Sequence, residues 1–237
     1  MNTVEVVLTP RLLPLYEIKG KIVVVIDILR ATSSICIAFA NGAQRIIPVS
    51  TPEESKSFAP LGFLCAAERN GSVVEGFDIG NSPQSYSAQV VNGRSIALTT
   101  TNGTHAIELS KSAYKVVIGS FLNLSFLCNW LKEQNKDVVL HCAGWKDKFN
   151  LEDTLFAGAV CTQLQNSFTL ACDSAIAATD LYKMAHSNLV QYIQKSSHAH
   201  RFQDLGIVKD IEICMQTDTL NLIPVLDGEF LIKMDFN

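Results

Sequence analysis

Short apolar runs alternate with longer amphipathic segments along the whole chain. Seven of these runs have the length and composition of strands, namely residues 4–8, 22–26, 45–49, 95–99, 115–118, 138–142 and 211–215. Helical patterns separate them at residues 32–41, 52–58, 103–110, 123–133, 152–165, 174–183 and 189–195. Strands that alternate with helices of this length form βαβ units. The pattern therefore predicts an α/β protein with three layers, α/β/α, around a mostly parallel or mixed central sheet.

No repeat, low-complexity linker or coiled-coil heptad divides the sequence. We therefore expect a single α/β domain over residues 1–237. Residues 223–237 predict a terminal hairpin or an edge strand. The segment from 65 to 83 is rich in turn residues and predicts a long loop.

Composition narrows the class of protein. Hydrophobic residues make up 48% of the 237 residues and charged residues 18%, which allows a large core and excludes a disordered chain. The net charge of −4 and the lack of a long basic cluster exclude nucleic acid and anionic membranes as expected partners. The start, MNTVEVVLTP, lacks the basic region of a targeting peptide, and polar residues interrupt the uncharged segment 154–172. We expect a cytoplasmic protein.

The seven cysteines are odd in number, and no two are spaced C-x-x-C. Most lie in apolar runs, where a reduced thiol behaves as a small hydrophobic side chain. A zinc site would need closer spacing of Cys and His. We therefore expect every thiol to be reduced.

The most informative segment is IVVVIDILRATSS at residues 22–34. An apolar strand ends at Asp27, and Arg30 and Thr32 follow where an apolar helical run begins. In an open parallel sheet, ligands bind beyond the carboxyl ends of the strands, and a helix N-terminus there attracts anions. An acid for a cation, an arginine for an oxyanion and a hydroxyl at a helix start predict a site for a metal and a phosphate-like group.

A second polar turn, TTNGT at residues 100–104, follows the strand at 95–99. Its small hydroxyl residues and the flexible Gly103 suit backbone N–H groups that wrap around an anion. The same residue types are favoured in an ordinary helix N-cap turn. Taken alone, the turn is better explained as an ordinary N-cap. When the Asp27 motif is also considered, an anion site and an N-cap turn are equally good explanations.

A third segment, AGWKDKFNLED at residues 143–153, follows the strand at 138–142. It places Lys146 and Lys148 in a turn and the adjacent acids Glu152 and Asp153 at the start of a helix. One acid could bind a metal while the other caps the helix. Acids in a first helical turn are also favoured by the helix dipole, which is the simpler interpretation for either acid alone.

Two other polar segments have plain alternatives. Glu68, Arg69 and Asp78 lie in the predicted loop, where function and simple solvation are equally compatible with the sequence. His198 and His200 could bind a ligand or transfer a proton, but a polar helix start is the favoured interpretation. There is no G-x-G-x-x-G, Walker A or G-x-S-x-G motif. Aspartyl-nucleophile phosphatases carry a second acid two residues after the first, where this chain has Leu29.

Several blocks together resemble the 2-phosphosulfolactate phosphatase family. They are, in order, VVVIDILRATSSI, AAERNG with GFDIGNSP, TTTNGTHAI, CAGWKDKFNLEDTLFAGA and SSHAHRFQDLGIVKDIEIC. The resemblance extends from about residue 4 to about residue 224. It implies a three-layer α/β/α fold and Mg²⁺-dependent hydrolysis of the phosphate monoester of a small sulfonated hydroxy acid, a step toward coenzyme M.

The family blocks contain the candidate site residues. Carboxylates come from Asp27, Glu68, Glu152 and Asp153, and oxyanion contacts from Arg30, Thr32, Lys146, Thr101, Asn102, Gly103 and Thr104, with Asn81 and Ser82 in the GNSP turn. From their chemistry we expect Asp27 to be the first metal ligand, with Glu68 or Asp153 next, and Glu152 to be a general base. The expected partner is a small phosphate ester, and a homodimer is compatible with the sequence.

Three alternatives stay open at this stage. The enzyme could be a Mg²⁺ phosphatase of another phospho-hydroxy acid on the same scaffold. It could be a binding protein that senses an anion or a nucleotide without turnover. It could also be an interaction protein that has kept the fold without the site, although the full set of candidate acids and bases argues against this.

Overall fold

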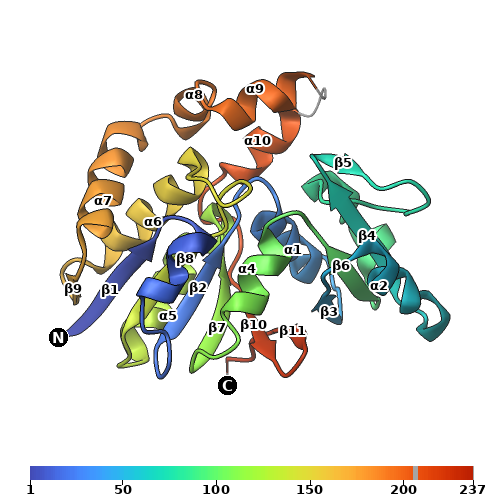
Figure 1. The fold of residues 1–237 in the computed structure, drawn as a ribbon, viewed down its shortest axis with the longest axis horizontal. Coiled ribbons are helices and arrows are strands. Elements are labelled where there is room, and N and C mark those ends of the chain that lie inside the picture. The colour runs from blue at the N-terminus through green and yellow to red at the C-terminus, as the bar shows by residue number, and fades with distance from the viewer. Residues whose placement is uncertain (205–207, 237) are drawn as a thin grey trace.

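The computed structural model describes residues 1–204 and 208–236. Within them, the strands form one mixed sheet in the order β5-β4-β6-β3-β11-β10-β7-β2-β8-β1-β9 (Figure 1). The strands are β1 (Asn2–Val7), β2 (Ile22–Ile26), β3 (Arg45–Pro48), β4 (Leu64–Arg69), β5 (Ser72–Val73), β6 (Ser95–Thr99), β7 (Lys115–Gly119), β8 (Val138–Cys142), β9 (Phe168–Leu170), β10 (Pro224–Asp227) and β11 (Phe230–Lys233).

The α-helices are α1 (Ala31–Ala40), α2 (Pro52–Ser57), α3 (Ala88–Val91), α4 (Gly103–Leu109), α5 (Leu124–Glu133), α6 (Leu151–Leu164), α7 (Asp173–Ala185), α8 (Leu189–Ile193), α9 (Ser197–Asp204) and α10 (Val208–Cys214). Short 3₁₀ turns are η1 (Pro10–Leu15), η2 (Ala59–Leu61), η3 (Pro83–Ser85) and η4 (Phe121–Asn123). In Figure 1, α8 and α9 form the upper edge of the molecule, and α10 lies beneath α9.

The sheet consists of two parallel blocks that the C-terminal hairpin joins. One block pairs β7, β2, β8, β1 and β9 in parallel, and the other pairs β3, β6 and β4 in parallel. Strand β10 pairs antiparallel with β7, and β11 pairs antiparallel with β3. The hairpin predicted for the C-terminal residues is therefore confirmed, but it lies in the interior of the sheet and not at an edge.

Successive side chains of β2 pack on opposite faces of the sheet, which explains why the fold has three layers, α/β/α. Ile22, Val24 and Ile26 pack in one apolar cluster with α5, α6 and α7, whereas Val23 and Val25 pack in another with α1 and α4. All five are fully buried, because successive side chains of a strand point to opposite faces and helices cover both. The predicted α/β architecture is confirmed.

Most of the helices and strands predicted from the sequence are present in the structure, with two exceptions. Residues 22–26, 95–99 and 138–142 are strands with the predicted bounds. The predicted strand at 211–215 is wrong, because these residues belong to helix α10 and the residue after it. The predicted loop is also partly wrong, since Glu68 and Arg69 end strand β4. This strand is short, and its last two residues are charged, so its sequence resembles a turn.

The state of the cysteines agrees with the prediction that every thiol is reduced. All seven cysteines are free, and all but Cys172 are buried. Burial raises the pKa of Cys161 and of Cys214 to about 12, so neither is a reactive thiolate. In the described part of the chain, no helix has the length and apolar character needed to cross a membrane.

Candidate active site

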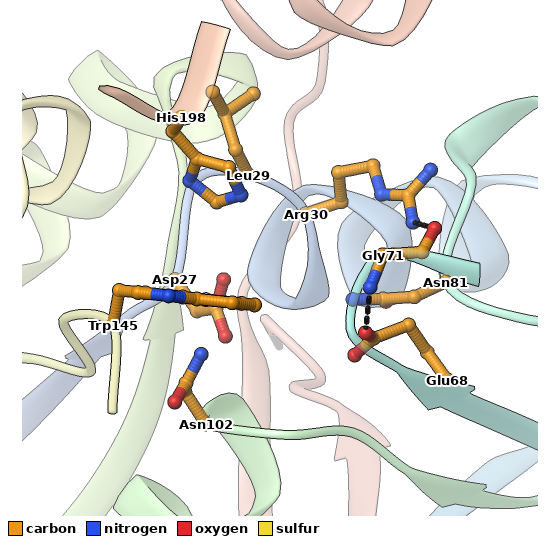
Figure 2. Close-up of a pocket in the computed structure, with 9 residues that line it drawn as sticks. All are labelled: Asp27, Leu29, Arg30, Glu68, Gly71, Asn81, Asn102, Trp145 and His198. Atoms are coloured by element: carbon orange, nitrogen blue, oxygen red, sulfur yellow. Dashed lines mark hydrogen bonds between the residues drawn. The ribbon is translucent and has the colours of Figure 1, made fainter. Parts of the chain in front are cut away.

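The C-terminal ends of both parallel blocks meet at one small, polar pocket. It is lined by Asp27, Leu29, Arg30, Glu68, Gly71, Asn81, Asn102, Trp145 and His198 (Figure 2). The space inside is about 10 Å³, close to what one water molecule needs.

Asp27 follows β2 directly and is the acid at the centre of the pocket. It is only 6% exposed, and its Oδ1 accepts a hydrogen bond from the backbone N–H of Ala31 at 3.4 Å. Thr32 fixes the turn, because its hydroxyl accepts from the N–H of Asp27 at 3.1 Å. Gly103 allows close approach of α4, since a Cβ there would lie 2.8 Å from Oδ2 of Asp27. A glycine at this position is thus required by the packing around the carboxylate.

The surroundings of Asp27 disfavour its negative charge. Burial raises the pKa of Asp27 to about 7; His198 opposes this shift, and the carboxylates of Glu68 and Glu152 add to it. A buried acid near two others is a group whose charge a bound cation would stabilise.

Glu68 reaches the pocket from the end of β4 and is held by three donors. It is 4% exposed and accepts a hydrogen bond from the backbone N–H of Gly71. The N–H and the hydroxyl of Thr101 both donate to it at 3.2 Å. Thr101, predicted to contact the substrate, is therefore placed to orient this carboxylate.

Arg30 lines the pocket, and a buried acid compensates its charge. Its Nη1 lies 2.6 Å from Oδ2 of Asp210 on α10, and its Nη2 donates to the carbonyl of Gly71 at 2.7 Å. Asp210 also accepts from the hydroxyl of Ser82 at 2.8 Å and from the amide of Gln84 at 2.9 Å. Ser82, predicted as a substrate contact, thus helps to hold the acid that positions Arg30.

His198 and Glu152 form a buried pair at the wall of the pocket. Nδ1 of His198, on α9, is hydrogen bonded to Oε1 of Glu152, on α6. Glu152 is fully buried, and its Oε2 has no hydrogen-bond partner among the described residues. The ring of Trp145 lies 5.4 Å from that of His198, between centroids. The sequence favoured a polar helix start for His198, which is where it lies, but nothing near it in the sequence predicted its pairing with Glu152.

Asp153 lies behind the pocket and already has its donors. Its Oδ1 accepts from the N–H of Ile28 at 2.9 Å, and its Oδ2 accepts from the N–H of Gly144 at 3.0 Å and the amide of Asn150 at 2.9 Å. Burial, then Asp27 and Glu152, raises the pKa of Asp153 well above its usual range. Its role as a metal ligand stays a prediction, and these bonds indicate that it ties the loops after β2 and β8 together.

Of the other predicted site residues, Asn81 and Asn102 line the pocket, whereas Lys146 and Thr104 support it from outside. Lys146 is exposed; its N–H donates to Oδ1 of Asn102 at 3.1 Å, and its ammonium lies 5.4 Å from the ring centroid of Trp145. Thr104 is buried and exchanges hydrogen bonds with Thr100, which fixes the turn before α4. Asn81 lines the pocket, and its buried Oδ1 has no partner among the described residues.

Comparisons with known proteins agree with this arrangement. A family model described as "2-phosphosulpholactate phosphatase" matches residues 7–229. The chain is 41% identical to a protein of Caldanaerobacter subterraneus subsp. tengcongensis over 93% of this chain and 94% of the relative. It is 41% identical to one of Thermotoga petrophila, over 93% and 96%, and 37% identical to one of Clostridium acetobutylicum, over 91% and 94%. Each relative is named "Probable 2-phosphosulfolactate phosphatase".

These matches cover nearly the whole chain, including every block that forms the pocket. They define an enzyme of the class that hydrolyses phosphate monoesters. Within that class, the chain belongs to the 2-phosphosulfolactate phosphatase family.

Proposed function

We propose that the protein hydrolyses 2-phosphosulfolactate to sulfolactate and phosphate with the help of Mg²⁺. The observation that carries this proposal is the pocket itself, where Asp27, Glu68 and Asn81 line one small space. Family membership supports the reaction type, and the names of the relatives support the substrate.

The residues of the pocket fit Mg²⁺. This ion prefers oxygen ligands and is usually bound through one or two carboxylates, with water and substrate oxygens filling the remaining positions. Among the described residues, no group of three His, Cys, Asp or Glu side chains could hold a metal ion, so the protein ligands proposed here are two carboxylates and one amide. We therefore assign Mg²⁺ to Asp27, Glu68 and Asn81. When bound, the ion would supply positive charge to the phosphoryl oxygens.

Arg30 would orient the anionic substrate. Its guanidinium lines the pocket and is fixed by Asp210 and Gly71. An arginine fork that is held in place before the ligand arrives loses little side-chain freedom on binding. The ion pair with Asp210 would therefore hold the guanidinium of Arg30 in the orientation that binds the substrate.

His198 is the group in this pocket that is best placed to move a proton. Hydrolysis of a hydroxy-acid phosphate leaves an alkoxide unless its oxygen is protonated as the bond breaks. Because Nδ1 is bonded to Glu152, a proton exchanged with the substrate would pass through Nε2. Glu152, predicted as a general base, would then act through His198, and we call it a positioning residue.

Substrate choice is tested by release of phosphate from a panel of esters. The panel contains 2-phosphosulfolactate, phospholactate, phosphoglycolate and a nucleoside monophosphate, each assayed with Mg²⁺ and with a chelator. We expect the highest kcat/KM for 2-phosphosulfolactate and loss of turnover with chelator. If another phospho-hydroxy acid has the highest kcat/KM, that ester is the substrate in place of 2-phosphosulfolactate. If the nucleotide has the highest kcat/KM, the proposal that the pocket selects a small phosphate ester is wrong. Binding without turnover of any ester would indicate an anion sensor.

A cytoplasmic location, a place in coenzyme M formation and a homodimer stay predictions. They follow from the sequence and the resemblance, and the pocket geometry does not depend on them.

A further inference from the structure

A second polar cavity, of about 260 Å³, lies beside the catalytic pocket. It is lined by Ser50, Arg69, Thr100, Thr101, Thr104 and His105, and shares none of these with the first pocket. Thr101 forms the wall between them, because it lines the second cavity while its N–H and hydroxyl donate to Glu68. Glu68 and Arg69 are successive residues of β4, whose side chains point to opposite faces of a strand. The two cavities are therefore built back to back.

Arg69 gives the lining of the second cavity a positive charge. This lining contains an arginine, a histidine and hydroxyl groups but no carboxylate. Arg69 forms no ion pair with any residue of the described ranges, whereas the charge of Arg30 is paired with Asp210. Its guanidinium is nevertheless held, since Nη1 donates to the carbonyl of Glu68 at 2.7 Å and Nη2 to the carbonyl of Ser50 at 3.0 Å. A fixed arginine without a counter-charge beside a cavity is suited to bind an anion.

A buried hydroxyl adds a second donor. Thr100 is 4% exposed, and its Oγ1 accepts a hydrogen bond from the N–H of Thr104 at 3.2 Å. Within the structurally described part of the chain, no hydrogen bond is formed in which this hydroxyl donates its proton. A hydroxyl has one proton to donate and two lone pairs. Thr100 can therefore donate to a ligand oxygen without losing the bond that holds Thr104.

We infer that this second cavity binds a small oxyanion of the phosphate, sulfate or sulfonate class. Its lining offers the guanidinium of Arg69 and hydroxyl donors, and its volume lies below that of pockets for drug-sized ligands. The anion could be a free inorganic ion or the sulfonate of an organic molecule, since both present the same oxygens. The inference concerns a different cavity from the one proposed for the phosphatase reaction, and Thr101 is the residue that links the two, since it lines the second cavity and donates to Glu68 of the first.

Sulfate is the probe for a direct test. Amide resonances of the intact protein are followed by NMR during titration with sodium sulfate at constant ionic strength. We expect saturable shifts at Thr100, Thr104 and His105, and an affinity lowered about tenfold or more by Arg69→Gln. Arg94→Gln is the matched control, because Arg94 is exposed and makes no side-chain contact that would place it at either cavity. Equal affinities in the two variants, or shifts confined to Gly71 and Asn81, would overturn the inference.

A second variant guards against a folding defect in Arg69→Gln. His105 is exposed, so His105→Gln should fold normally and still weaken sulfate binding severalfold. No change in His105→Gln together with an unfolded Arg69→Gln would count against the site. The source of the anion is separated by repeating the titration with methanesulfonate and by steady-state kinetics. Sulfate that competes with a sulfonated substrate in the wild type but not in Arg69→Gln indicates the substrate's own sulfonate, and binding without competition indicates a free ion; competition that is unchanged in Arg69→Gln would place the sulfate in the first pocket and count against the site.

Discussion

Nδ1 of His198 is hydrogen bonded to Oε1 of Glu152, although the two residues lie 46 positions apart on helices α9 and α6. Both side chains are buried, and the imidazole reaches the pocket that contains Asp27 while Glu152 stays behind it. The pair thus connects the wall of the active site to the interior of the α6 layer. It also gives the two helices different roles, since α9 supplies the group at the pocket and α6 the group that orients it.

Removal of either member of this pair should lower activity by different amounts. We expect His198→Ala to reduce kcat by roughly 100-fold or more, as for a lost general acid or base, and Glu152→Gln to reduce it less. The double variant should be no worse than His198→Ala alone, because Glu152 acts through His198. The measurement is kcat as a function of pH, in which Glu152→Gln should shift the profile. His200→Ala is the control, since His200 is exposed on the same helix; a similar loss there would argue against the assignment.

Asp27→Asn should cost far more activity than stability. The isosteric amide keeps the size of the side chain and removes a charge that burial and nearby acids disfavour in the metal-free protein. Loss of one electrostatic contact at the reacting group typically lowers the rate by about 100-fold or more. Thermal melting without metal is compared with the Mg²⁺-dependent rate, and Asp78→Asn at an exposed site is the control. An active Asp27→Asn enzyme would remove Asp27 from the site.

Asp153→Asn distinguishes a structural acid from a metal ligand. Asparagine has one acceptor oxygen, so its NH₂ group would face the backbone N–H of Ile28 or of Gly144. Leaving a buried donor unsatisfied costs about 1–3 kcal/mol, and we expect a lower melting temperature with and without Mg²⁺. Activity measured well below that temperature should be largely kept. A variant that melts like the wild type but needs much more Mg²⁺ would instead identify Asp153 as a ligand.

Local patterns predicted the elements that carry the first half of the candidate site. The strand before Asp27, the start of α1 and the turn at Thr101–Thr104 are each encoded within a few consecutive residues, so apolar runs and their ends locate them. The Ala-Ala-Glu-Arg-Asn-Gly segment was wrongly predicted to be a loop, because turn residues follow the end of strand β4 directly. The segment Asp-Ile-Glu-Ile at 210–213 was wrongly predicted to be a strand, because its polar and apolar residues alternate. In the structure, the buried residues Ile211 and Cys214 have helical spacing.

Long-range pairs could not be predicted in this way. Arg30 and Asp210 are 180 residues apart, and nothing near either residue identifies the other. Asn81 was predicted from its place in the GNSP turn, but its unpartnered, buried oxygen is seen only in the folded structure. Such contacts arise from the packing of α9 and α10 over the ends of the strands, so only the folded structure brings them together.

A buried histidine outside the site gives the stability of the protein a defined dependence on pH. His141 on β8 is fully buried, and burial, with a smaller effect of His105, lowers the pKa of His141 to about 4. Its Nδ1 lies 2.9 Å from the hydroxyl of Ser110, which itself donates to the carbonyl of Ala106 at 2.8 Å. The neutral ring therefore carries its proton on Nδ1 and donates to Ser110.

The sign of the effect follows from this lowered pKa. In the unfolded chain the imidazole titrates near 6.5, so the unfolded state takes up a proton first as the pH falls. The free energy of unfolding should therefore be fully retained above about pH 6.5 and should decrease between pH 6.5 and pH 4, by up to about 3 kcal/mol from this residue. His141→Asn keeps a donor near the Nδ1 position and cannot be protonated in this range. Urea unfolding at several pH values should show a flatter pH dependence for the variant than for the wild type, whatever its absolute stability. Parallel curves for the two proteins between pH 6.5 and pH 4 would show that His141 does not titrate differently in the folded and unfolded states.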